Sequence, residues 1–237
     1  MHIFCKNQLD VSKEIAYKGL IDHFSLFDQE DFHSQKVHHQ IKSFYENTLA
    51  FQLTSTTYWH KGFRLLSKLY KKVSRKIEQI NLPLHEEDEL KVDSQVISID
   101  SNQDGRVNPR AWVRIDSQSQ KAVFVAIYSY HKHHEHVYLN IALPLPFGHM
   151  TGILRMENME EEQSDGLVLT SQSKKGEKGD EGIYYVTKWF TIRLPLNERF
   201  EVWTKDFTSA KLKATHKMWL YGKQFLTINY WIRRKCT

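Results

Sequence analysis

The chain has few of the features that stabilise secreted proteins or anchor membrane proteins. Only two cysteines occur among 237 residues, Cys5 and Cys236, which is too few for a disulfide framework and typical of a reducing compartment. The longest apolar runs, within 122–128 and 138–147, reach about ten residues, whereas a helix that spans a bilayer needs about 20. The first residues show no basic segment followed by an apolar stretch. We therefore expect a soluble, cytoplasmic protein without a secretory signal.

The motifs of common enzyme classes are also absent. The sequence contains no G-x-S-x-G, no glycine-rich phosphate loop and no H-E-x-x-H. Nothing in the sequence brings a catalytic pair together, so we assign no catalytic residue, no cofactor and no reaction. The sequence favours a protein without enzymatic activity, and an enzyme acting on an apolar substrate remains an alternative. The scattered acids and bases are Asp93, Asp116, His149, Glu157 and His216.

The composition indicates one folded domain. Hydrophobic residues make up 41% of the chain and aromatic residues 13%, which is enough apolar surface to offset the chain entropy lost on folding. We predict a single domain over 1–237, mainly helical in 1–85 and antiparallel β in 86–237. The net charge of +5 allows weak attraction to an anionic membrane surface or to nucleic acid, and nucleic acid is the less favoured partner.

Three N-terminal segments carry apolar residues at helical spacing. Residues 11–24 and 33–48 predict two short helices, because apolar residues recur every three or four positions. Residues 63–80 have the clearest apolar stripe, and the pattern ends before Pro83. Either the stripe packs on the sheet while its flanking cations stay solvated, or those cations bind anionic lipid or phosphate. The predicted surface-binding cations are Arg64, Lys68, Lys71, Lys72, Arg75 and Lys76.

From residue 89 onward the apolar residues alternate, as is typical of strands. Short polar or glycine-containing turns separate the runs, so consecutive strands are expected to pair antiparallel. We predict an α+β fold: a curved antiparallel sheet or partly closed β-barrel of about eight to ten strands, with two or three N-terminal helices. The expected strands are 50–59, 90–99, 110–116, 121–130, 136–145, 150–157, 166–172, 183–194, 198–204, 211–221 and 224–233.

Two segments have the composition of metal sites. The sequence YHKHHEH places His131, His133, His134 and His136 in or beside a hairpin turn, where consecutive side chains point apart. Residues 100–105 match the opening of a calcium loop, but Ala111 stands where the closing glutamate is required. We interpret both segments as solvated turns and predict no physiological metal.

Aromatic residues in the predicted strands have three interpretations: core packing, the lining of an apolar pocket, or stacking on nucleic-acid bases. The first functional hypothesis is a non-enzymatic module whose concave, aromatic-rich face binds a lipid-like or other apolar small molecule. The predicted ligand-binding residues are Trp112, Tyr128, Trp189, Phe190, Trp203 and Trp219, with Arg114 and Arg193 as polar anchors.

Four segments carry a resemblance to a known domain: RLLSKLYKKVSRKIEQINLP, AWVRID, LPFGHMTGILRMEN and GIYYVTKWFTIRLPLNERFEVW. Their shared features are a helix ending at Leu82 and Pro83, a Trp112-x-Arg114 strand, and an Arg-Leu-Pro-Leu turn at 193–196. Together they resemble a bacterial domain of unknown function. That domain occurs alone in small uncharacterised Bacillus-type proteins and at the C-terminus of saccharopine-dehydrogenase-like proteins. The resemblance covers about residues 33–233 and implies a fold type without a catalytic residue or an assigned function.

Overall fold

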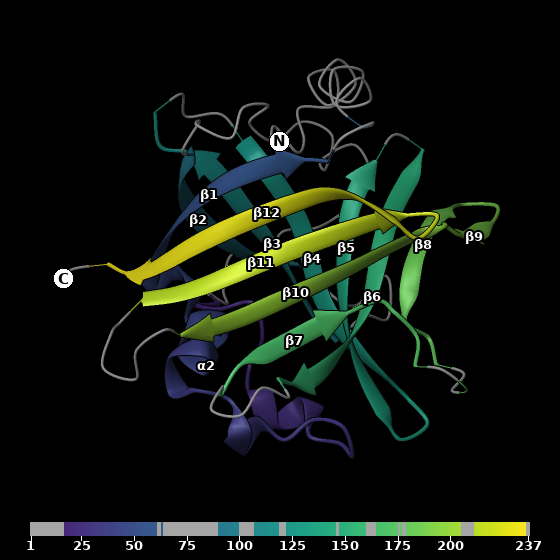
Figure 1. The fold of residues 1–237 in the computed structure, drawn as a ribbon, viewed down its shortest axis with the longest axis horizontal. Coiled ribbons are helices and arrows are strands. Elements are labelled where there is room, and N and C mark those ends of the chain that lie inside the picture. The colour runs from purple at the N-terminus through teal and green to yellow at the C-terminus, as the bar shows by residue number, and fades with distance from the viewer. Residues whose placement is uncertain are drawn as a thin grey trace.

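The described strands form one antiparallel sheet that closes on itself (Figure 1). The computed structural model describes residues 17–60, 63, 90–99, 107–118, 122–145, 147–159, 165–174, 176, 179–204 and 211–235. Ten of the described strands, in the order β5-β4-β3-β2-β1-β12-β11-β10-β7-β6, make a ring that the β5–β6 pairing completes. The strands are β1 (Phe51–Trp59), β2 (Leu90–Ser98), β3 (Val107–Asp116), β4 (Ala122–His133), β5 (His136–Leu145), β6 (Gly148–Asn158), β7 (Leu167–Thr170), β8 (Gly182–Thr187), β9 (Thr191–Arg193), β10 (Leu196–Thr204), β11 (Lys211–Leu220) and β12 (Lys223–Arg234).

Alternating side chains explain why these segments form barrel strands. In β1 every second residue from Phe51 to Trp59 is buried, and the intervening residues are more exposed. A strand places successive side chains on opposite faces, so this pattern gives the barrel one inner and one outer face. The predicted strands and the antiparallel barrel are confirmed, and the predicted strand 183–194 divides into the hairpin of β8 and β9.

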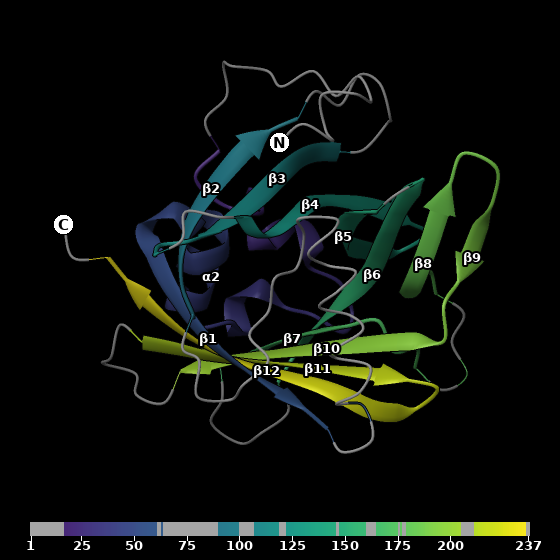
Figure 2. The same ribbon diagram turned by 90° about the horizontal axis from the view of Figure 1, so that it is seen from above.

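Strand β6 closes the barrel and also carries the extra hairpin. Its residues 148–154 pair with β5, and on its other edge residues 148–153 pair with β8 while 155–158 pair with β7. The β8–β9 hairpin therefore diverges from the ring, as Figure 2 shows from above. Gly148 permits the close approach of β8, because a Cβ atom there would lie 2.1 Å from the carbonyl oxygen of Val186.

An N-terminal segment covers one end of the barrel (Figure 1). It contains the helix α2 (His39–Glu46) and three 3₁₀ turns, Phe24–Phe27, Ser34–Lys36 and Thr48–Ala50. Its apolar side chains join the same core cluster as the inward-facing residues of the strands. This segment therefore contributes to the core as well as covering it. Its most buried apolar residues are Phe24, Phe27, Phe32, Ile41 and Phe44.

The predicted N-terminal helices are only partly present. Of the predicted helix 11–24, residues 17–23 are not helical, and the 3₁₀ turn Phe24–Phe27 follows. Here Leu20 N donates a hydrogen bond to the carbonyl oxygen of Tyr45, and Gly19 permits this approach, because a Cβ atom there would lie 2.3 Å from that oxygen. The predicted helix 33–48 is shorter, at 39–46. The predicted helix 63–80 lies outside the described residues, apart from Phe63.

Candidate ligand site inside the barrel

The two ends of the barrel interior differ in how tightly they are packed. At the end next to α2, inward-facing side chains such as Leu154, Met156 and Leu167 are completely buried. The opposite end carries the β5–β6 turn (residues 145–148) and the β11–β12 turn (220–223), and we call it the distal end. Toward it, inward-facing apolar side chains remain partly exposed although they pack against the core: Phe124, Leu143, Phe200 and Met218. The distal half of the interior therefore offers accessible apolar surface.

Arg114 is a buried cation in this distal half. It lies on β3 between Ser94 of β2 and Phe124 of β4, and its residue is 9% exposed. Its guanidinium carbon is 4.0 Å from the ring centroid of Phe124, 4.7 Å from that of Trp112 and 5.9 Å from that of Tyr230. Within the part of the chain that the structure describes, Arg114 makes no ion pair, and its Nε has no hydrogen-bond partner. Among the described residues, the groups that offset its charge are therefore these aromatic rings.

Unpartnered donors gather on the wall that carries Arg114. Among the described residues, the buried atoms without a hydrogen-bond partner include four on the neighbouring strands β1, β2 and β3. Buried polar atoms nearly always have a partner, so such a group indicates water or a polar ligand. All four atoms can donate, which favours a ligand rich in acceptors. They are Thr57 Oγ1, Ser94 Oγ, Trp112 Nε1 and Arg114 Nε.

A carboxylate and an imidazole lie on the wall formed by β10 and β11. His216 Nε2 is 3.0 Å from Glu198 Oε2, and both residues are buried. The His216 ring stacks on Phe200 with centroids 3.7 Å apart. Ser171 fixes the main chain of Glu198, because its Oγ accepts a hydrogen bond from Glu198 N at 2.8 Å and its N donates to Glu198 O at 3.0 Å. The Glu198 carboxylate also occupies space beside Gly152, where a Cβ atom would lie 2.4 Å from Oε1.

Tyr128 links the two walls electrostatically. Burial raises the pKa of its phenol well above the ordinary value, Arg114 opposes this, and Tyr45, Tyr230 and Glu198 add to it. The phenol is therefore neutral at physiological pH and is available as a hydrogen-bond donor. Because both Arg114 and Glu198 act on its pKa, Tyr128 lies within electrostatic range of each of them.

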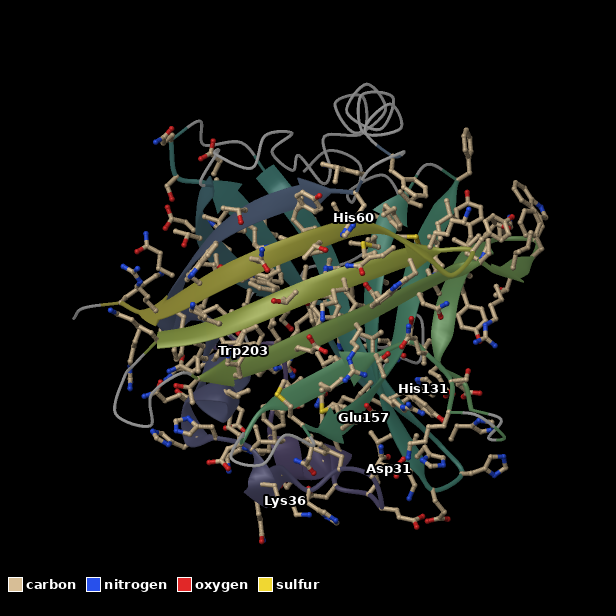
Figure 3. All side chains as sticks on the ribbon, viewed as in Figure 1. Asp31, Lys36, His60, His131, Glu157 and Trp203 are labelled. Carbon is tan, nitrogen blue, oxygen red and sulfur yellow. The ribbon has the colours of Figure 1, made fainter. Side chains whose placement is uncertain are left out.

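The structure brings together three of the eight predicted ligand-binding residues: Trp112, Arg114 and Tyr128 are all buried inside the barrel. The other five lie elsewhere. Trp189 and Phe190 are exposed at the tip of the β8–β9 hairpin, and Arg193 is exposed on β9. Trp203 and Trp219 are partly buried on the outer face, since their neighbours Val202 and Met218 face inward; Figure 3 labels Trp203 on this wall. Alternation alone could not tell the inner face from the outer one.

Sequence reasoning missed Glu198 and Tyr230 as interior residues and treated His216 as isolated. The sequence contained a sign that His216 faces the interior. His216 alternates with the apolar residues Ala214 and Met218 along β11. A charged or polar residue in the buried phase of a strand is uncommon unless it has a partner. Identifying that partner required the pairing of β10 with β11.

The histidine-rich turn lies on the outside of the barrel. His131 Nε2 and His133 Nδ1 lie 3.2 and 2.9 Å from the same atom, Asp180 Oδ2, and His131 Nδ1 is 3.0 Å from Asn140 Oδ1 (Figure 3 labels His131). His131 also borders an outer cleft of about 460 Å³ beneath β8. The described residues include no group of three ligating side chains placed to hold a metal ion. The calcium-like segment 100–105 and the cations of 64–76 lie outside the described residues.

Comparison with known proteins yields one informative relative. The chain is 39% identical over 222 residues to a Bacillus subtilis (strain 168) protein named "Uncharacterized membrane protein YndJ". The match covers 94% of this chain but only 39% of that protein, so the chain spans about two fifths of its relative. No family model matches the chain. No solved structure matches it either.

These findings support part of the resemblance found in the sequence. The chain is similar to an uncharacterised Bacillus protein, as expected, but the comparisons do not support the link to saccharopine-dehydrogenase-like proteins. Among the described residues, no helix combines the length and apolar character needed to cross a membrane. The class that the fold defines is a closed antiparallel β-barrel with polar groups in its interior.

Proposed function

We propose that the barrel binds an amphipathic small molecule with an anionic head group. The head would contact Arg114, and the apolar part would lie against the accessible inward-facing side chains of the distal half. The observation that carries the proposal is the buried guanidinium of Arg114, which aromatic rings surround and no described carboxylate neutralises.

The energetic argument rests on the cost of burying an unpaired charge. The effective penalty is several kcal/mol for one ion, whereas a desolvated cation–π contact returns about 2 kcal/mol. An anion that accepts hydrogen bonds from the guanidinium would supply the missing interaction. The unpartnered donors of Ser94 and Trp112, beside Arg114 on the same wall, favour the same kind of head group.

The test is calorimetric titration with laurate and with lauryl alcohol, which share a chain and differ in head charge. Wild-type protein is expected to prefer laurate. Arg114→Met should lower laurate affinity about 10- to 100-fold, the value of a charge-assisted hydrogen bond, and leave the alcohol nearly unchanged.

Arg233→Met is the matched control, because it removes the same charge from an exposed position of β12. It should bind laurate like the wild type. Equal laurate affinity in the wild type and Arg114→Met, or no binding by either, would show that Arg114 is not an anion anchor.

An enzyme acting on an apolar substrate is a second candidate, favoured by the buried Glu198–His216 pair. A carboxylate at 3.0 Å from a histidine can orient the imidazole as a general base. Hydrolysis of p-nitrophenyl laurate tests this idea. His216→Asn and Glu198→Gln should both abolish turnover while laurate still binds. Turnover that is absent from the wild type, or retained by both variants, would remove this candidate for ester substrates.

We also propose that the cations of residues 64–76 bind an anionic membrane surface and that the protein is cytoplasmic. A further proposal is that the chain is related to the domain found at the C-terminus of saccharopine-dehydrogenase-like proteins. Because the relative is named a membrane protein and is much longer than the matched region, we also propose that this barrel works beside a membrane.

A further inference from the structure

Large apolar side chains are exposed at three turns of the distal end. Phe147, in the β5–β6 turn, is 86% exposed, and Tyr221, in the β11–β12 turn, is 79% exposed. At the β8–β9 tip, Trp189 is 77% exposed, with Phe190 and Ile192 about half exposed. Single exposed apolar residues are ordinary, but a concentration of aromatic rings at one end indicates an interaction surface.

The β8–β9 hairpin contacts both of the other turns. Gly148, which follows Phe147, pairs with Thr187 at the start of the β8–β9 tip. Tyr221 N donates a hydrogen bond at 2.8 Å to the carbonyl oxygen of Pro195, which lies two residues beyond β9, at the base of the hairpin. Phe147 therefore adjoins the tip of this hairpin, and Tyr221 adjoins its base.

Two of these aromatic residues hold unfavourable backbone conformations. Phe147 has a φ of +67° and Tyr221 a φ of +49°, in the left-handed region that glycine and asparagine adopt far more readily. A bulky residue there costs stability, and exposure of its ring recovers none of that cost by burial. Folding therefore does not account for aromatic residues at these two positions.

The charge of these turns has one sign. The segments 145–148, 187–195 and 220–223 contain Lys188, Arg193 and Lys223 and no aspartate or glutamate. Lys188 and Lys223 are exposed beside Trp189 and Tyr221, whereas Arg193 donates hydrogen bonds to Ser173 Oγ and to the carbonyl oxygen of Glu181. Such a surface is complementary to an anionic partner.

We propose that this rim docks on the surface of an anionic lipid bilayer. We define the distal rim as Phe147, Lys188, Trp189, Phe190, Tyr221 and Lys223. Amphipathic aromatic side chains are favoured at the interface between water and lipid, and each lysine near an anionic leaflet raises affinity by about fivefold. Rings on separate turn tips suit insertion between head groups better than contact with a flat protein surface. The inference does not depend on Arg114 or on any ligand inside the barrel.

Flotation of the full chain with vesicles tests the proposal. The protein is expected to float with vesicles that contain phosphatidylglycerol and to bind phosphatidylcholine vesicles more weakly. The double variant Lys188→Glu/Lys223→Glu should lose at least about tenfold in affinity for phosphatidylglycerol vesicles. The matched control Lys211→Glu/Arg233→Glu makes the same change of net charge near the covered end and should bind normally.

A second pair of variants separates docking from folding. Phe147→Gly and Tyr221→Asn relieve the left-handed backbone strain, so the thermal midpoint should stay unchanged or rise while vesicle affinity falls. Arg114→Met should float like the wild type, which separates this proposal from the interior ligand.

Three results would overturn the proposal. One is no flotation of the wild type with phosphatidylglycerol vesicles. Another is vesicle binding that the rim substitutions leave unchanged, or that the control substitutions weaken instead. The third is a concentration-dependent dimer that the rim substitutions dissociate, without vesicle binding, which would assign the rim to contact between copies of the chain.

Discussion

Arg110 and Arg114 are two buried arginines on the same face of β3, and their surroundings differ. Arg110, 2% exposed, donates to Asp22 Oδ1 at 2.7 Å and to the carbonyl oxygen of Gly19 at 3.1 Å, and it lies 3.8 Å from the Tyr17 ring centroid. The N-terminal segment supplies all three contacts. Arg114, toward the distal end, contacts the rings of Trp112, Phe124 and Tyr230 and makes no ion pair with a described residue. Arg110 therefore completes the fold, whereas Arg114 is the arginine that we propose binds a ligand.

The largest expected effect concerns packing at the two ends of the interior. Leu154 is completely buried near the covered end, whereas Leu143 is partly exposed toward the distal end. Leu154→Ala should lower the free energy of unfolding by about 3 kcal/mol, because the cavity cannot collapse, and Leu143→Ala by about 1 kcal/mol. Urea denaturation measures both values. Equal losses would mean that the two ends are packed alike.

The Asp22–Arg110 pair should be the next most sensitive feature. Asp22→Asn leaves a buried guanidinium without its carboxylate and should cost about 2 kcal/mol, less than a fully buried pair, because the Asp22 side chain is 27% exposed. Urea denaturation of Asp22→Asn beside Asp31→Asn, a partly exposed carboxylate in the same segment, measures the difference. A cost no larger than that of the control would contradict the role assigned to Arg110.

The pair also predicts a pH dependence. Burial alone would raise the pKa of Asp22, but the hydrogen bonds from Arg110 and Asn108 outweigh it and hold the pKa below its ordinary value of 3.8. The stabilisation is therefore complete above about pH 5 and is lost as the pH falls through the pKa of the folded state. The stability difference between wild type and Asp22→Asn should shrink at acidic pH. If this stability difference grew on acidification, the ionised Asp22 carboxylate would not be the form that stabilises the fold.

Arg114→Met should change the free energy of unfolding in the opposite direction to Asp22→Asn. Replacing an uncompensated buried cation with an apolar side chain should leave stability unchanged or raise it by about 1 kcal/mol. Thermal and urea unfolding of the ligand-free protein measure this value. A loss of stability comparable to that of Asp22→Asn would indicate that Arg114 stabilises the fold. It would contradict our proposal that Arg114 binds a ligand.

The smallest expected effect is at Thr57, on the same wall. Thr57 Oγ1 is buried and has no hydrogen-bond partner among the described residues. Because valine has nearly the same shape, Thr57→Val should stabilise the protein by about 0.5–1 kcal/mol. Thr48→Val is the contrasting variant, since Thr48 Oγ1 donates to the carbonyl oxygen of Phe44 at 2.7 Å, and it should destabilise. Equal effects would indicate that ordered water satisfies Thr57.

The sequence by itself determined the local features of this protein. Alternation placed the strands to within a few residues, and short turns required antiparallel pairing, because both depend on neighbouring residues. The two-residue spacing of Trp112 and Arg114 already placed them on one face. The N-terminal helices were overestimated, because the close contact of Gly19 with the carbonyl oxygen of Tyr45 is not visible in helical spacing.

Only the tertiary structure decided which face was inside. Closure depends on β6 pairing with β5, β7 and β8 at once, a set of contacts between residues distant in sequence. That closure encloses Trp112 and leaves Trp203 on the outer face, although both lie in alternating strands. It also brings Glu198 beside His216 and gives Arg110 its carboxylate, whereas no described carboxylate pairs with Arg114. Periodicity specifies that a strand has two faces, and only packing against distant strands makes one of them the interior.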